Sequence, residues 1–145
     1  MLNPSRYRIL AIGKTRKQWI KEGVQTYLKR LPGLKITELR DSNSEKESIA
    51  ICSEKKSDEI LIALTEEGDL MSSIVFTKYL ENIGSQKIAF AIGGANGLTA
   101  HLKGSAQLQL SLSTLTFPHE IARLLLLEQL YRASTISQGG PYHRA

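Results

Sequence analysis

The sequence predicts an α/β domain in which a parallel β-sheet is flanked by helices. Two observations support this: short apolar runs alternate with longer segments of helical periodicity, and the runs are apolar at nearly every position. Strands of that kind are buried on both faces, as in parallel sheets covered by helices. The chain has 145 residues, 41% of them hydrophobic, which is enough for one substantial core. We expect a single domain over residues 1–145.

Five apolar segments are the predicted strands. They comprise residues 8–12, 35–39, 59–64, 87–92 and 108–115. The second is the least apolar, because polar residues alternate with its apolar ones. A turn is expected over residues 66–69, where two glutamates are followed by glycine and aspartate.

Helical segments follow the strands in turn. They comprise residues 16–31, part of 41–56, 72–83, 99–107 and 118–134. Pro32 and Gly84 mark the ends of the first and third helices, and Thr99 suits the N-cap of the fourth. Pro118 suits the first turn of the last helix, with Thr116 as its expected cap.

The last predicted helix is apolar on nearly every side, with leucines at positions 124–127 and at 130. A helix of this kind needs burial on more than one side. In a small domain, one side can cover the sheet and another can meet a second copy of the chain. We therefore expect a homodimer.

Basic residues are concentrated near the N-terminus of a chain whose net charge is +5. Residues 1–40 carry ten Lys or Arg and two acidic side chains, whereas residues 41–81 carry four and ten. This asymmetry favours a basic surface that can meet nucleic-acid phosphates. A basic helix face that contacts only solvent is the alternative, and charge does not decide between them.

Composition excludes several classes of protein. Cys52 is the only cysteine, which rules out an internal disulfide framework and a cysteine-based metal cluster. Apolar runs such as residues 124–127 are far too short to span a bilayer, and the first residues contain no apolar leader. We therefore expect a cytoplasmic protein without a membrane partner.

Two loops at predicted strand ends are the candidate ligand-binding segments. Residues 93–97, Gly-Gly-Ala-Asn-Gly, follow the fourth strand, and residues 112–117 end the fifth. The carboxyl ends of parallel strands share one edge of a sheet, where ligands bind. The glycines match neither the dinucleotide fingerprint nor the P-loop. An ordinary strand-to-helix turn and a capped strand end remain the alternatives for these two loops.

The candidate polar groups are histidines and arginines near the C-terminus. His119 and Arg123 are one helical turn apart and share a face. A local capping or packing role is the alternative for His119. Tyr142, His143 and Arg144 follow a Gly-Gly-Pro turn, and a frayed terminus is the alternative for this tail.

Carboxylates are scarce in the same region. Only Glu120 and Glu128 are acidic after residue 81, so we expect neither two-carboxylate hydrolase chemistry nor a metal site there. What remains is a site of backbone groups, hydroxyls, apolar walls and cations. Such a site suits the positioning of an already activated donor near an electron-rich acceptor.

Several motifs together carry a family resemblance. They are Ile-Gly-Gly-Ala-Asn-Gly-Leu at 92–98, the segments at 112–119 and 127–133, Arg123, Pro-Tyr-His-Arg at 141–144, and the N-terminal segments 9–14 and 27–31. This set resembles the RlmH-type (YbeA-type) methyltransferases, small SPOUT-class enzymes that methylate N3 of a pseudouridine in large-subunit ribosomal RNA. The resemblance extends over essentially the whole chain. Some members have Pro-Glu where this chain has Ala-Asn at 95–96, which favours a backbone role for that loop.

The resemblance implies a SPOUT-type fold with a C-terminal trefoil knot, a homodimer, and S-adenosylmethionine as methyl donor. It also implies ribosomal RNA as partner, within the large subunit or the assembled ribosome. The donor contacts of the family fall on the end of the third strand and on the two loops. They are Leu64, Gly93, Gly94, Leu112, Ser113, Thr114, Leu115, Thr116 and Phe117.

For catalysis we expect the C-terminal tail to act on the base. Attack by N3 of pseudouridine requires the loss of its proton and in-line alignment with the methyl group. His143 is expected to accept or relay that proton, and Arg144 to offset negative charge. Tyr142 is expected to stack on the base or hydrogen-bond to it.

RNA contacts are expected at the basic N-terminal region and at the last helix. Lys14, Arg16 and Lys17 should meet phosphates, which makes binding salt-dependent. His119 and Arg123 are expected on the RNA side of the pocket. Two other functions stay open: a non-catalytic RNA- or ribosome-binding module, and a nucleotide-binding protein that uses the glycine turn for phosphate.

Overall fold

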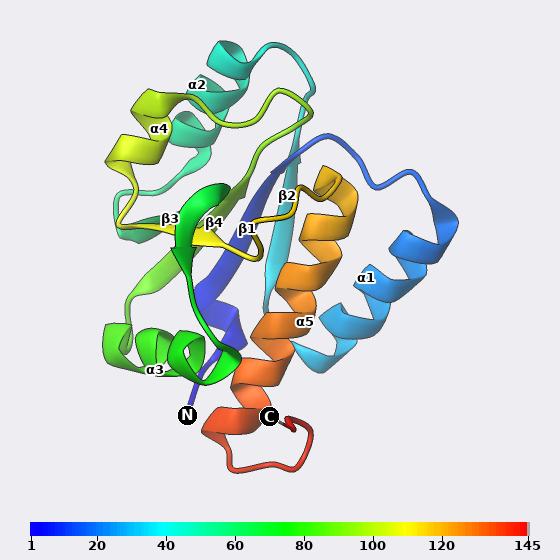
Figure 1. Cartoon of the computed structure of the whole chain (residues 1–145), viewed down its shortest axis with the longest axis vertical. Coiled ribbons are helices and arrows are strands. Elements are labelled where there is room, and N and C mark those ends of the chain that lie inside the picture. The colour runs from blue at the N-terminus through cyan, green and yellow to red at the C-terminus, as the bar shows by residue number, and fades with distance from the viewer. Residues whose placement is uncertain (145) are drawn as a thin grey trace.

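The computed structural model describes residues 1–144 and contains a five-stranded sheet in the order β2-β1-β4-β3-β5 (Figure 1). The strands are β1 (Tyr7–Ile12), β2 (Lys35–Leu39), β3 (Glu59–Leu70), β4 (Lys87–Ile92) and β5 (Leu108–Ser111). Every neighbouring pair in this order is parallel. The predicted parallel sheet is therefore confirmed.

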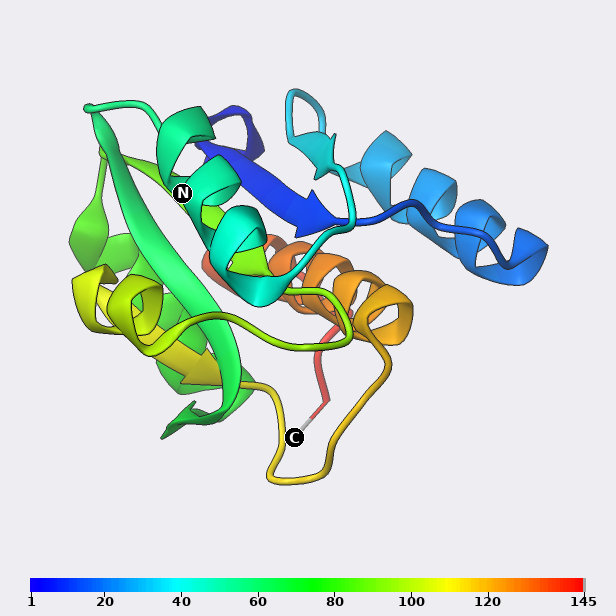
Figure 2. The same ribbon diagram turned by 90° about the horizontal axis from the view of Figure 1, so that it is seen from above.

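Helices cover both faces of the sheet (Figures 1 and 2). Three lie on one face: α1 (Gln18–Arg30), α3 (Ser73–Ile83) and α5 (His119–Ser137). Two lie on the other: α2 (Ser44–Glu54) and α4 (Ala100–Ser105). A short 3-10 helix, Pro4–Arg6, precedes β1. Within the described residues, no helix has the length and apolarity needed to cross a membrane.

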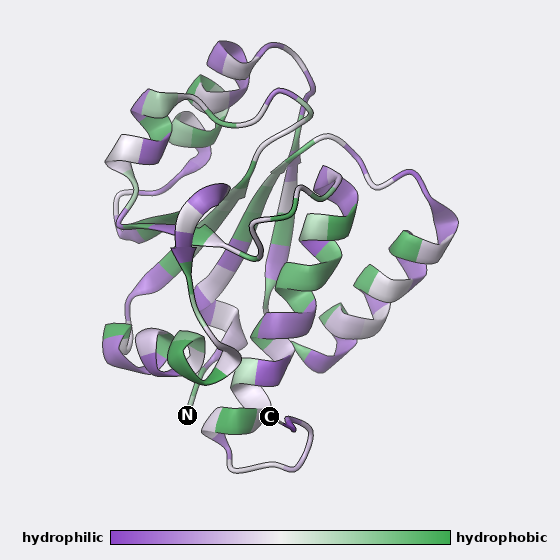
Figure 3. Ribbon diagram, viewed as in Figure 1, coloured by the Kyte–Doolittle hydropathy of each residue, from purple (hydrophilic) through white to green (hydrophobic). Residues whose placement is uncertain are grey.

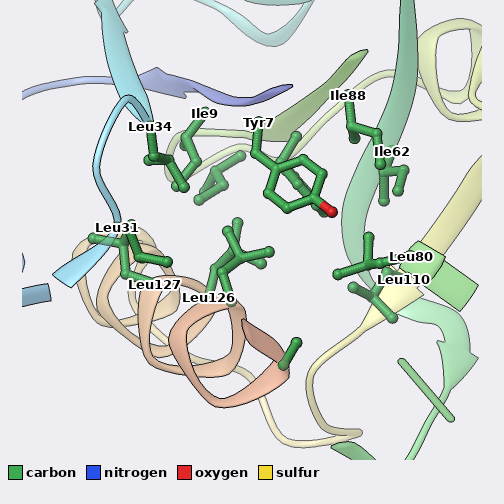
Figure 4. Packing of buried hydrophobic residues seen from close by; sticks show 14 of the residues in the cluster. Tyr7, Ile9, Leu31, Leu34, Ile62, Leu80, Ile88, Leu110, Leu126 and Leu127 are labelled. Carbon is green, nitrogen blue, oxygen red and sulfur yellow. The ribbon is translucent and has the colours of Figure 1, made fainter. Parts of the chain in front are cut away.

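Alternate residues along the central strands pack into two separate cores. Along β4, Ile88 and Phe90 face α1, α3 and α5, whereas Ala89 and Ala91 face α2 and α4. Phe90 lies edge-to-face with Phe76 of α3, with ring centroids 6.5 Å apart. Figure 4 shows the larger core between the sheet and α5, and Figure 3 shows the apolar residues that recur along the strands. Burial on both faces explains why these strands are apolar at nearly every position.

β3 and β5 differ from the predicted boundaries. β3 continues to Leu70, so the turn expected at 66–69 is wrong. Its pairing with β5 shifts register between Leu64 and Asp69. At Gly68 a Cβ atom would lie 2.5 Å from the carbonyl oxygen of Gln109, so glycine here permits close approach to β5. β5 ends at Ser111, earlier than predicted, and the Ser111 hydroxyl donates to the Ser113 carbonyl at 2.8 Å in the loop that follows.

Most of the predicted helix ends are confirmed. Thr99 caps α4 by accepting from the N–H of Leu102 at 3.2 Å, and Gly84 ends α3 with φ +69°. The expected cap of α5 is wrong: Pro118 occupies the N-cap, and the Thr116 hydroxyl donates to the Glu66 carboxylate instead. Pro118 takes the N-cap, so Thr116 lies two residues before it, and its hydroxyl donates to Glu66 instead of accepting from an N–H of the first helical turn.

α5 is enclosed on several sides within one chain. It packs against α1, α3 and the sheet, and a Cβ atom at Gly23 of α1 would lie only 3.0 Å from Leu124 Cδ1. Leu126, Leu127 and Leu130 are buried in the larger core. Neighbours in the same chain therefore account for much of the apolar pattern of α5. The homodimer and the trefoil knot stay predictions.

Candidate active site

A pocket of about 730 Å³ lies at the carboxyl edge of the sheet. Its walls are the end of β3, the loop 93–98 after β4, and the loop 112–118 between β5 and α5. Because β3 lies between β4 and β5 in the sheet, the three segments meet side by side. Open parallel sheets bind their ligands in this position.

The pocket brings together almost all residues expected to contact the methyl donor. Those that line it are Leu64, Gly93, Gly94, Leu112, Ser113, Leu115, Thr116 and Phe117. Thr114 lies on the same loop with an exposed side chain, outside the lining of the pocket. The structure therefore brings the two loops to one cavity, as the sequence suggested.

Backbone geometry shapes the loop 93–97. At Gly93 a Cβ atom would lie 2.9 Å from the carbonyl carbon of Gly97, so only glycine fits where the loop folds back on itself. Gly97 has φ +72°, a conformation that favours glycine, and its N–H donates to the Gly94 oxygen at 3.0 Å. A ligand can therefore approach the backbone of this loop closely.

α2 supports the same loop from behind. The Ser48 hydroxyl accepts a hydrogen bond from the N–H of Thr99, at the end of the loop, at 3.1 Å. Glu47 is buried, and its Oε1 lies 3.3 Å from the place a Cβ of Gly94 would occupy. The other oxygen of Glu47 accepts from the N–H of Ser42 at 2.8 Å. α2, which the sequence predicted only as part of residues 41–56, therefore supports the wall of the pocket formed by loop 93–97.

Thr65, Glu66, Glu67 and Lys103 also line the pocket, and the sequence alone did not identify them. Glu67 pairs with Lys103 at 3.1 Å, and Glu66 accepts from Thr116 across the pocket. Thr65, Glu66 and Glu67 were missed because the predicted third strand ended before them, and Lys103 lies on α4. Gly68 was the available signal, since a glycine in a strand marks a bulge or a close backbone approach as well as a turn.

His119 lines the pocket at the first turn of α5. The next residue, Glu120, accepts hydrogen bonds from the N–H groups of Arg16 at 2.6 Å and of Lys17 at 3.3 Å. Burial alone would raise the pKa of Glu120, but these two N–H groups outweigh it and leave the pKa lowered. The carboxylate therefore stays charged and holds residues 13–17, the basic loop, against α5.

Arg123 lies in the interior and not on the surface expected to face RNA. Its side chain is only 1% exposed, and Nη1 pairs with Glu38 at 2.7 Å. The guanidinium also donates to Thr15 Oγ1 at 2.7 Å and to the Gly13 oxygen at 2.9 Å. Since the side chain is buried and both Nη atoms bond inside the protein, this residue supports the basic loop instead of contacting RNA. The side chains of Lys14, Arg16 and Lys17 are exposed, as expected of phosphate ligands.

The C-terminal tail folds back onto α5. The Tyr142 hydroxyl donates to Glu128 Oε2 at 2.8 Å, and the Tyr142 ring lies edge-to-face with Tyr131 at 4.8 Å between centroids. The guanidinium carbon of Arg132 lies 4.8 Å from the centre of the Tyr142 ring. Arg132 Nη1 is 3.1 Å from His143 Nδ1. The sequence pointed to the tail but missed Glu128, which anchors it.

The tail and the pocket lie apart within one chain. Tail residues are absent from the pocket lining over the described part of the chain. Glu128 is nine residues beyond His119 on α5, which corresponds to about 13 Å along a helix. Figure 1 shows the tail at the end of α5 opposite the loops of the pocket. One chain therefore does not bring the expected catalytic residues to the expected donor site.

Comparison with known sequences gives a consistent result over the whole chain. Residues 5–143 match the family model described as predicted SPOUT methyltransferase. The chain is 62% identical to ribosomal RNA large subunit methyltransferase H of Prochlorococcus marinus, over 99% of each chain. It is 60% identical to the protein of the same name from a Synechococcus strain, over 99% of this chain and 100% of that one.

Solved structures share the fold at low identity. A probable methylase family protein from Haemophilus influenzae has a TM-score of 0.61 at 12% identity, over 98% of this chain and 72% of that one. The SpoU methyltransferase AviRb from Streptomyces viridochromogenes, in complex with AdoMet, has a TM-score of 0.52 at 13% identity, over 92% and 58%. With the full-length family match, these observations lead to one conclusion: the chain belongs to the SPOUT methyltransferase family.

Proposed function

We propose that the protein is an S-adenosylmethionine-dependent methyltransferase that modifies N3 of a pseudouridine in large-subunit ribosomal RNA. The observation that carries the proposal is the pocket, because the segments that the family resemblance assigns to the donor form its walls. The name of the relatives, ribosomal RNA large subunit methyltransferase H, supports the substrate class. We propose a cytoplasmic location because a ribosomal substrate is met there.

The chemistry of the pocket suits S-adenosylmethionine. Leu112, Leu115 and Phe117 offer apolar surface to the adenine ring, and Leu115 is 70% exposed. The carboxylates of Glu66 and Glu67 suit the positive charges of a sulfonium and an amino group. When bound, the donor supplies an electrophilic methyl group. The task of the protein is then to align the acceptor and stabilise its charge.

Hydrogen bonds to neighbouring residues define the protonation of the tail. The bond to Glu128 raises the pKa of Tyr142, so the phenol stays protonated at neutral pH. Because the guanidinium of Arg132 can only donate, His143 Nδ1 accepts and the ring proton lies on Nε2. In this arrangement His143 donates a hydrogen bond from Nε2. The proton relay expected from the sequence would require the loss of the contact with Arg132.

We therefore assign His143 and Arg144 to stabilising the imidate that forms when N3 loses its proton to solvent. The Nε2–H of His143 donates to a carbonyl oxygen of the base, and the exposed guanidinium of Arg144 offsets the negative charge. With the donor bound, N3 would attack the methyl carbon in line, the carbon–sulfur bond would break, and the thioether would leave. Because the tail and the pocket are apart in one chain, the proposal includes a homodimer in which each tail serves the pocket of the partner.

Single-turnover methylation of large ribosomal subunits tests the assignment. Substituting His143→Ala or Arg144→Ala should slow the transfer about 100-fold and leave donor affinity, measured by calorimetry, unchanged. His101→Ala is the matched control, because His101 is an exposed histidine of α4 away from the tail. Wild-type rates in both tail variants would refute the role of the tail. A wild-type protein that fails to bind the donor would favour the non-catalytic RNA-binding module.

A further inference from the structure

Arg123 and Glu120 connect the start of α5 to the basic loop through hydrogen bonds and an ion pair. Arg123 is the largest fully buried side chain of the described structure, and it bonds to Gly13, Thr15 and Glu38. Burying a guanidinium is costly unless it is paired and hydrogen-bonded. Its Nε has no hydrogen-bond partner within residues 1–144, so the pairing of this buried guanidinium is incomplete.

The basic loop is held at successive backbone positions without belonging to a helix or strand. Gly13 donates to the Leu39 oxygen at 2.7 Å, and Thr15 donates its N–H to Glu38 at 3.2 Å. Arg16 and Lys17 donate their N–H groups to Glu120. The backbone is therefore fixed, while the side chains of Lys14, Arg16 and Lys17 are exposed to solvent.

The start of α5, which carries Glu120 and Arg123, also forms part of the donor pocket. His119 and Ala122 line the pocket, whereas Glu120 and Arg123 contact the basic loop. The two pairs lie on different faces of the helix, so the start of α5 contacts the donor pocket with one face and the basic loop with another. The distance between the basic loop and the pocket is thereby determined by α5.

We propose that Arg123 and Glu120 are positioning residues that hold the basic loop at a defined place relative to the donor pocket. Lys14, Arg16 and Lys17 then meet backbone phosphates in a register that brings the target base to the pocket. Arg123 acts on RNA through the loop and does not touch it. The inference rests on the proposed RNA substrate, which it deepens by naming the residues that set its position.

Removing the carboxylate of Glu120 tests whether this residue positions the basic loop or only changes the charge beside it. Loss of a negative charge beside a basic loop should strengthen RNA binding if charge alone matters. If Glu120 positions the loop, Glu120→Ala should weaken the binding of large-subunit ribosomal RNA about threefold to tenfold and reduce the slope of log affinity against log salt. Glu22→Ala is the matched control, because Glu22 is an exposed carboxylate of α1 near the loop, and it should not weaken binding.

Two further measurements distinguish positioning from a general loss of structure. Glu120→Ala should speed amide hydrogen exchange at residues 13–17 while donor affinity and the melting temperature stay near wild type. Arg123→Lys keeps the charge but loses the planar fork, so it should raise the KM for RNA more than it lowers kcat. RNA binding by Glu120→Ala at or above wild-type strength, with normal exchange, would overturn the proposal. If the wild type binds no ribosomal RNA, the proposed function fails, and the exchange measurement still tests whether Glu120 holds the loop.

Discussion

Glu128 organises the C-terminal tail through bonds from several side chains. It accepts from Tyr142, from Arg132 at 2.8 Å and from Gln129 at 3.0 Å. The chain reaches this carboxylate because Gly139, with φ +73°, turns it back after α5. The sequence could identify the tail from its unusual composition. It could not identify Glu128, because the contact depends on how the chain turns after the helix.

Tyr142 should act as a neutral hydrogen-bond donor at every pH used for assays. The hydrogen bond to Glu128 raises its folded-state pKa above the ordinary value of about 10. The contact therefore stabilises the tail fully below that value and is lost only as the pH rises through the higher folded pKa. Tyr142→Phe should lower the single-turnover rate by the same factor from about pH 6 to about pH 9. An inflection in the wild-type profile that disappears in the variant would contradict this role.

At the scale of elements, hydrophobic periodicity predicted each strand and four of the five α-helices, but not the ends that tertiary contacts determine. α2 was expected only as part of the polar segment 41–56. β1, β2 and β4 were predicted to within a residue, because apolar runs mark buried strands directly. The extension of β3 depends on Gly68 meeting β5, and β5 ends early at Ser111, whose hydroxyl donates within the loop that follows. Neither interaction has a periodic signature. Both lie beside residues that line the pocket, and Glu66 and Glu67 were not predicted there because the third strand was expected to end at residue 64.

Gly68→Ala tests whether the close approach of β3 to β5 shapes the pocket. A methyl group would meet the Gln109 carbonyl, so the strands must separate, at a cost of about 1–3 kcal/mol in the free energy of unfolding. Because Glu66 and Glu67 precede the contact, donor affinity should fall as well. Calorimetry and chemical denaturation measure the two effects.

Gly104→Ala is the matched control for this substitution. A Cβ at Gly104 of α4 would meet no atom within 4 Å, and alanine favours helix, so stability should be unchanged or slightly higher. Equal behaviour of the two variants would show that the approach at Gly68 is unimportant.

At the scale of the whole molecule, the separation of the tail from the pocket is the main argument for two copies. Analytical ultracentrifugation at micromolar concentration should therefore give the mass of a dimer. A mixture of His143→Ala protomers with protomers defective in the pocket, such as Gly94→Val, should regain activity. Random mixing leaves about a quarter of the sites with a partner tail and a pocket that are both intact. A stable monomer with full activity would contradict the shared site.

Across the whole molecule, the sequence predicted the distribution of charge better than the position of Arg123. The excess of Lys and Arg in residues 1–40 predicted a basic surface correctly, since Lys14, Arg16 and Lys17 are exposed. Arg123 was predicted on the surface that faces RNA, but it is buried. Helical spacing shows which residues share a face of a helix, but not what packs against that face. Buried ion pairs of this kind join segments far apart in the sequence.

Mass mapping of modified ribosomal RNA tests the central claim most directly. Purified protein, S-adenosylmethionine carrying a labelled methyl group and ribosomes from cells that lack the enzyme would be incubated together. Nuclease digestion and tandem mass spectrometry would then locate the label. The account predicts one labelled methyl group, on N3 of a pseudouridine in the large-subunit RNA. Label on another atom or on small-subunit RNA, or no transfer by protein that binds the donor, would contradict it.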